Sequence, residues 1–196
     1  MKRPFTHSSA KRERGFSLIA TLVLLVIASL LGVAASQLVL MSERSSRYDR
    51  DRLIAFQAAE AALLDAELDI RGPGSTRSSL FSPTSIAGFE EGCSTGSTTV
   101  GMCLPASAGE SPIWSTVSFT DTNRTVAFGD YTGRQYAAGT SGVQPARTPR
   151  YLIELIPDPT PGGNEGAPRN LYRVTAVGFG PREEIQVMLQ MFFRKE

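Results

Sequence analysis

The sequence predicts an α+β protein in which a long N-terminal helix packs on a C-terminal antiparallel β-sheet. Two observations carry this prediction. Residues 16–42 form a charge-free apolar run that continues into an alanine-rich stretch ending before Gly72. Residues 150–196 contain three β-rich segments separated by turn residues. An apolar helix face and an apolar sheet face must each be buried, and packing one on the other satisfies both.

Composition limits the classes of function. Setting aside a leader and the apolar run leaves about 150 residues, enough for one modest domain. The formal net charge of +1 gives no strong field for nucleic acid. The one histidine, His7, lies near the N-terminus, so a Ser/His/Asp triad or a histidine metal site is not expected in the mature domain. We expect neither enzymatic activity nor a cofactor or metal.

The apolar run, residues 16–42, is long enough to cross a bilayer core of about 30 Å as a helix. A simple signal-anchor would show the same run. Basic residues outnumber the single acidic Glu13 in residues 1–15, which predicts a cytoplasmic leader and an exported C-terminus. These basic residues are Lys2, Arg3, Lys11, Arg12 and Arg14.

The junction between leader and apolar run has a distinctive order, Arg-Gly-Phe-Ser-Leu-Ile over residues 14–19. It resembles the type III leader of type IV pilins and pseudopilins. The resemblance implies that a prepilin peptidase cuts after Gly15 and that the new N-terminal Phe16 is methylated. A glycine at that place lets a protease approach the backbone closely.

The fifth position of the mature chain would be Ala20, where most major pilins carry a glutamate. In that family the glutamate is thought to pair with the N-terminal ammonium of a neighbouring subunit. A subunit without it cannot dock onto a subunit above, although it can stand at the top, which predicts a tip or priming role. The alternative is that van der Waals packing suffices for docking and that Ala20 says nothing about position.

Residues 43–71 are predicted to continue the helix as its amphipathic half. Charged pairs Glu43/Arg47 and Arg47/Asp51 have i,i+4 spacing, which supports a solvated helix. The predicted apolar face then comprises Leu53, Phe56, Ala59, Leu63, Ala66 and Ile70, with Glu60 and Glu67 at its edge. With residues 72–74, Gly-Pro-Gly, ending it, the helix would be roughly 80 Å long.

Residues 72–149 read as a variable, loop-rich region. Cys93 and Cys103 bracket a short loop, and a disulfide there would contribute about 2–4 kcal/mol; metal binding by two lone cysteines is a weaker alternative. Residues 113–119 read as a strand with Trp114 in the core, and residues 124–136 as another strand or hairpin. Asp121, Asn123 and Asp130 are Ca²⁺ candidates whose spacing fits no familiar loop well.

The C-terminal region, residues 150–196, is predicted to form the sheet. Strands are expected at 150–156, 171–179 and 184–193, and the short connection makes the last two an antiparallel hairpin. In the last strand, every second residue is apolar, with Gln186 and Gln190 among the residues between them; the apolar positions are Ile185, Val187, Leu189, Met191 and Phe193. Gly178 is predicted to permit a bulge or close packing.

Two stretches narrow the resemblance to the PilX minor pilins. The first is Ala-Phe-Gln-Ala-Ala-Glu-Ala-Ala-Leu, residues 55–63, and these minor pilins also lack the fifth-position glutamate. The second combines residues 150–154 and 172–176 with Gly178, Gly180, Arg194 and Lys195.

This resemblance implies a minor pilin that primes a bacterial type IV pilus and sits at or near its tip. Implied partners are other minor and major pilins, a PilY-type tip adhesin, prepilin peptidase and the inner-membrane assembly platform. It implies an inner-membrane protein that becomes extracellular on assembly, with roles in adhesion and twitching motility. The alternatives are a K-type tip pseudopilin of type II secretion and a membrane-anchored periplasmic protein or enzyme.

Overall fold

The structure, a computed structural model, describes residues 16–139, 142–157 and 170–195. The chain divides into two compact units, Met1–Arg47 and Tyr48–Glu196, and we call the second unit the head. Helix α1, Phe16–Arg71, contributes its first part to one unit and its last part to the head. The predicted helix end at residues 72–74 is confirmed. The predicted leader, residues 1–15, and the Pro/Gly loop at 158–169 lie outside the described residues.

The head contains three long strands and several short elements. The long strands are β3 (Arg150–Pro157), β4 (Asn170–Phe179) and β5 (Gln186–Phe193). They pair antiparallel in this order, which confirms the predicted hairpin between the last two strands. Strand β1 (Met102–Cys103) adds to β3 in parallel and β2 (Val126–Ala127) adds antiparallel, so the whole sheet is mixed.

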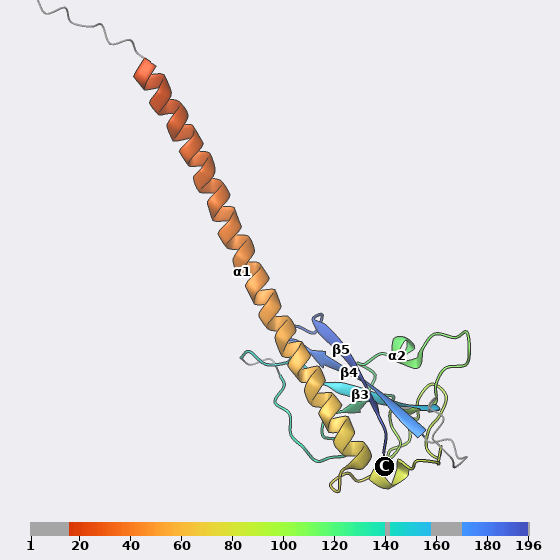
Figure 1. The fold of residues 1–196 in the computed structure, drawn as a ribbon. Coiled ribbons are helices and arrows are strands. Elements are labelled where there is room, and N and C mark those ends of the chain that lie inside the picture. Colours follow the sequence, from red (N-terminus) through yellow and green to blue (C-terminus); the bar gives the residue numbers. More distant parts are fainter. Residues whose placement is uncertain (1–15, 140–141, 158–169, 196) are drawn as a thin grey trace, which may run out of the picture. The chain divides into compact units, whose positions relative to one another are not determined.

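The last part of α1 covers one face of this sheet (Figure 1). Its buried apolar residues there are mostly small, namely Ala55, Ala58, Ala59, Ala62 and Ala66, followed by Ile70. From the sheet, alternate residues of β3 and β4 point to the same core, namely Tyr151, Ile153, Leu155, Tyr172, Val174 and Ala176. The opposite face carries a second core around the Cys93–Cys103 disulfide, with Leu152, Val177 and Phe179.

The predicted apolar face of α1 was partly wrong. Leu53 is 54% exposed and Phe56 is 38% exposed, whereas Ala55 and Ala58 are fully buried. The cause is the close approach of helix and sheet at Gly178. A Cβ at this glycine would lie 2.0 Å from the Ala55 carbonyl oxygen, so only small residues fit between the two layers. The prediction that Gly178 allows close packing is confirmed.

One prediction for the middle region was wrong and another was right only in part. Residues 113–119 do not form a strand: Ile113–Thr116 is a short helix, α2, preceded by Pro112. The Ser115 hydroxyl donates to the Pro112 carbonyl at 2.7 Å, which favours this turn over an extended chain. The strand expected within residues 124–136 is present but short, because only Val126–Ala127 pairs with β3. Trp114 is partly buried against the second core, as predicted.

Candidate functional site: the apolar helix surface and the anchored head loops

The first part of α1 presents an apolar surface. Side chains from residue 18 to residue 50 are exposed, except Ala20, which is half-buried. The most apolar 18-residue window of the helix has a mean hydropathy of 2.8, and none of it is buried. The helix is long and apolar enough to cross a membrane, and a protein surface of this kind can also be covered by similar helices.

Hydroxyl groups on this surface bond to the helix backbone. The Thr21 hydroxyl donates to the Leu18 carbonyl at 2.9 Å, and Ser29 and Ser36 donate to the carbonyls four residues earlier at 2.7 and 2.9 Å. A hydroxyl satisfied in this way can face lipid or an apolar neighbour without leaving a polar group unpaired. Residues 18–42 therefore offer an apolar surface along their whole length.

The predicted processing residues lie at the start of this helix. Gly15 is outside the described residues, and Phe16 is the first residue of α1. Ala20 follows one turn later, in a stretch with no carboxylate between residues 16 and 42. Cleavage after Gly15, methylation of Phe16 and the meaning of Ala20 stay predictions.

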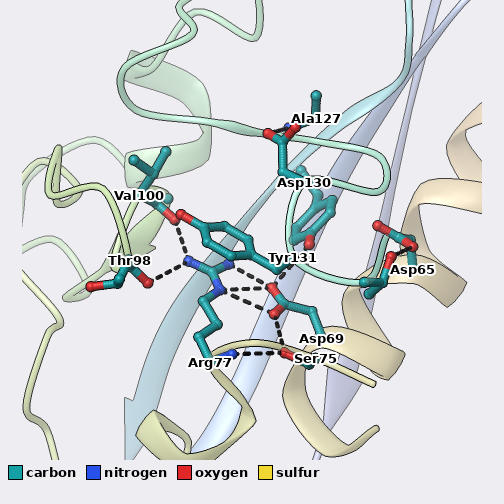
Figure 2. Close-up of polar contacts among 12 residues, drawn as sticks. Asp65, Asp69, Ser75, Arg77, Thr98, Val100, Ala127, Asp130 and Tyr131 are labelled. Atoms are coloured by element: carbon teal, nitrogen blue, oxygen red, sulfur yellow. Dashed lines mark hydrogen bonds and ion pairs between the residues drawn. The ribbon is translucent and has the colours of Figure 1, made fainter. Parts of the chain in front are cut away.

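In the head, a buried ion pair fixes the chain after the helix ends. The Arg77 side chain is 1% exposed and Asp69 is fully buried. Arg77 Nη2 lies 2.5 Å from Asp69 Oδ2, and Nε donates to both carboxylate oxygens at 3.1 and 3.0 Å. Such a two-point contact holds both groups in one orientation. Figure 2 shows the pair at the centre of a larger network.

The remaining groups of Arg77 and Asp69 join other parts of the head. Arg77 Nη1 donates to the Val100 carbonyl at 2.7 Å, and its guanidinium carbon lies 3.6 Å from the centre of the Tyr131 ring. Asp69 accepts from the Tyr151 hydroxyl at 2.9 Å. Helix α1, the disulfide loop, strand β3 and the loop at 131 therefore meet at one charge pair (Figure 2).

Burial affects the tyrosines of this network. Burial is the main cause that raises the pKa of Tyr151 well above its ordinary value, and the Asp69 carboxylate raises it further. The pKa of Tyr131 is also raised, mainly by burial, although Arg77 opposes this shift. Both phenols are thus neutral hydrogen-bond donors at neutral pH. They donate hydrogen bonds that help to hold these parts of the head together.

A second buried carboxylate, Asp65, holds the loop after β2. It accepts from the Gly129 amide at 2.8 Å and from the Thr132 hydroxyl at 2.6 Å. Arg134 lies 3.5 Å away with its side chain 38% exposed. Sequence reasoning missed Asp65, Asp69 and Arg77. The available signal was that both aspartates share the helix face of the buried alanines.

The predicted disulfide is present and closes the loop that receives Arg77. Cys93 and Cys103 are joined with their Cα atoms 4.0 Å apart. Val100, whose carbonyl accepts from Arg77, lies inside this loop, and Cys103 belongs to β1. The disulfide thereby connects the buried ion pair to the sheet.

The Ca²⁺ candidates serve local turns. Asp121 accepts from the Asn123 amide at 2.9 Å, and Asp130 accepts from the Ala127 amide at 2.9 Å. Within the described residues, no group of three or more His, Cys, Asp or Glu side chains is placed to hold a metal. Asp51, predicted to pair with Arg47, pairs instead with Arg50 at 3.0 Å and Arg182 at 3.6 Å.

Comparison with known proteins agrees with this arrangement. A search of the curated proteins found no match, and a search of the solved structures found none. Two family models match: PilX N-terminal over residues 14–64, and type IV pilus assembly protein PilX C-terminal over residues 91–195. The first covers the apolar helix and most of its alanine-rich continuation, and the second covers the disulfide loop and the sheet. The second alone spans more than half of the sequence, so this chain belongs to the PilX family of type IV pilus assembly proteins.

Proposed function

We propose that this chain is a minor pilin that primes assembly of a type IV pilus and is incorporated at or near its tip. Family membership makes it a pilus assembly protein that interacts with other pilus components. The tip position is our inference, and one observation carries it: the apolar helix has Ala20 where a bulk subunit carries a glutamate. A helix without this carboxylate lacks the group that pairs with the amine of a subunit above.

The mechanism is helix association without catalysis. Before assembly the apolar part of α1 spans the inner membrane, with the basic leader cytoplasmic and the head periplasmic. Prepilin peptidase removes the leader after Gly15 and methylates Phe16. The assembly platform then moves the subunit out of the membrane, and its exposed apolar side chains pack against the helices of major and minor pilins.

The head's role in this mechanism is to stay rigid and display its loops. The disulfide and the Asp69–Arg77 pair hold residues 72–139 against the helix end and the sheet. A rigid head presents the same surface to neighbouring pilins and to a PilY-type tip adhesin, which we propose as its extracellular partners. Two PilX models favour this pilus role over the type II secretion pseudopilin that the sequence also allowed.

The tip position is tested by locating the subunit in sheared pili. A small epitope tag in the exposed loop at Gly109 allows immunogold labelling of the wild-type chain. We expect label at one end of the fibre. In an Ala20→Glu variant, the added carboxylate supplies the missing pairing group, and label should spread into the shaft.

Ala28→Glu is the matched control for this experiment. It adds the same charge to the same apolar surface two turns further along, where it cannot reach a neighbouring N-terminus at the same level. We expect it to lower incorporation without moving label along the shaft. Wild-type label dispersed along the fibre would refute the tip position.

A further inference from the structure

Strand β5 forms an edge of the sheet in the head. It pairs with β4 through eight consecutive residue pairs, from Tyr172↔Phe193 to Phe179↔Gln186. Among the strands that the structure describes, the order is β1-β3-β4-β5, so none lies on the outer side of β5. Figure 1 shows β5 as the last strand of the layer. The outer side of such a strand carries backbone groups available to another strand.

One backbone hydrogen bond beside the turn between β4 and β5 shows which residues of β5 direct their backbone groups away from β4. The Gly180 amide donates to the Ile185 carbonyl at 2.7 Å, which makes this a hydrogen-bonded pair. Hydrogen-bonded and non-bonded pairs alternate along an antiparallel ladder. It follows that odd-numbered residues of β5 direct their backbone groups to β4. Gln186, Met188, Gln190 and Phe192 direct theirs to the free side.

This edge lacks the features that usually protect an edge strand. Residues 186–193, Gln-Val-Met-Leu-Gln-Met-Phe-Phe, contain no charge and no proline. Their pairing with β4 has no bulge. Phe192 is 62% exposed and Met188 is 42% exposed, on the sheet face away from α1. Natural proteins normally cover, charge or interrupt an edge of this length.

We propose that β5 is a docking edge that binds an extended, uncharged segment of another pilus component as an additional strand. This inference rests on the proposed function, because it requires the head to meet other pilus components. The uncharged character of the edge selects the occupant: a charged segment would lose hydration without gaining an ionic partner. A segment with alternating apolar side chains would pair with Met188 and Phe192 on one face of the sheet.

A second copy of this chain is a poorer occupant of the β5 edge, because pairing two β5 strands antiparallel would place their helices in opposite directions. Two β5 strands related by a two-fold axis would pair antiparallel, and Met188 of each could lie opposite Phe192 of the other. The same axis would reverse the direction of the last part of α1, which packs on the sheet, in one copy relative to the other. Chains anchored in one membrane, or bundled in one fibre, need their helices parallel. This argument disfavours an antiparallel pair of two β5 strands, and we assign the partner strand to a different component.

Site-specific photo-cross-linking in piliated cells tests the pairing. The photoreactive residue p-benzoylphenylalanine replaces Met188 or Phe192 in the full-length chain, and Ile86, which is 60% exposed in a loop, serves as the control position. We expect adducts from both edge positions to map to one segment of another pilus component. Moving the probe from 188 to 192 should move the cross-linked position by about four residues, as strand pairing requires.

Charged edge variants give a second readout. Met188→Lys with Phe192→Lys should lower recovery in sheared pili by about tenfold, which corresponds to about 1.4 kcal/mol and lies within the range for two cross-strand pairs. Ile86→Lys should leave recovery unchanged. Adducts to β5 of a second copy, adducts at scattered positions, or wild-type recovery of the double variant would overturn the docking edge alone. Absence of the wild-type chain from pili would overturn the proposed function and this inference with it.

Discussion

Gly178 gives the most direct test of how the head is packed. In Gly178→Ala, the new Cβ would lie 2.0 Å from the Ala55 carbonyl oxygen, 2.3 Å from the Ala59 amide nitrogen and 2.9 Å from the Ala58 carbonyl carbon. All three are backbone atoms, so no side chain can rotate away. Since contacts below 3.0 Å essentially never occur, helix and strand must separate by about 1 Å.

The energetic cost follows from this separation. Overpacking a core costs about 1–3 kcal/mol, and a clash with helix backbone belongs at the upper end. We expect Gly178→Ala to lower the free energy of unfolding by about 3 kcal/mol. For a chain of this size the melting temperature should fall by about 6–12 °C.

The assay is urea unfolding of the full-length chain in detergent, followed by the fluorescence of Trp114. Gly74→Ala is the matched control, because no atom lies within 4 Å of its new Cβ. We expect it to change the free energy of unfolding by no more than about 0.5–1 kcal/mol, with a gain in stability favoured. A Gly178→Ala protein as stable as this control would refute the close approach of α1 and β4.

Three further predictions concern buried groups of the head. Asp69→Asn should cost about 3–5 kcal/mol of unfolding free energy, because it leaves the Arg77 charge buried without a partner; stability within 1 kcal/mol of wild type in urea unfolding would count against the network. Removing the Cys93–Cys103 disulfide by double alanine substitution should cost about 2–4 kcal/mol in the same assay; an unchanged midpoint would contradict its structural role. Burial raises the pKa of Tyr172 to about 12, so between pH 10 and 12 the phenol ionises in the unfolded chain but not in the folded one. The free energy of unfolding should therefore be constant in this respect below pH 10 and fall by about 1.4 kcal/mol per pH unit between pH 10 and 12. Tyr172→Phe should reduce this slope in urea unfolding measured at several pH values.

Much of the fold could be predicted from residue patterns. β-rich segments bounded by turn residues located β3 and β4, alternating apolar residues located β5, and the glycines and proline at 72–74 located the end of α1. These signals are local, because period-two alternation and helix-ending residues act on their immediate neighbours. The disulfide was predictable because Cys93 and Cys103 are the only two cysteines in the sequence.

The contact face of α1 could not be predicted from hydrophobicity alone. Large residues such as Leu53 and Phe56 score higher than alanine, yet the alanines form the contact. The distance between helix and sheet decides this, and Gly178, more than one hundred residues away, sets that distance. A long-range steric fit of this kind leaves no mark in the periodicity of the helix itself.

The buried charges were missed for a related reason. Asp65 and Asp69 look like ordinary solvated residues until Arg77 and the loop at 129–132 close over them. Their pairing depends on loop positions that local propensities do not determine. The short helix α2 was misread because a brief apolar run fits a strand and a helical turn equally well.

The central claim is that a processed apolar helix carries this head into a pilus. The most direct measurement is mass spectrometry of the N-terminal peptide of the chain recovered from sheared, purified pili. The account predicts a chain that starts at N-methylated Phe16. A chain found only in membranes, still beginning at Met1, would contradict it.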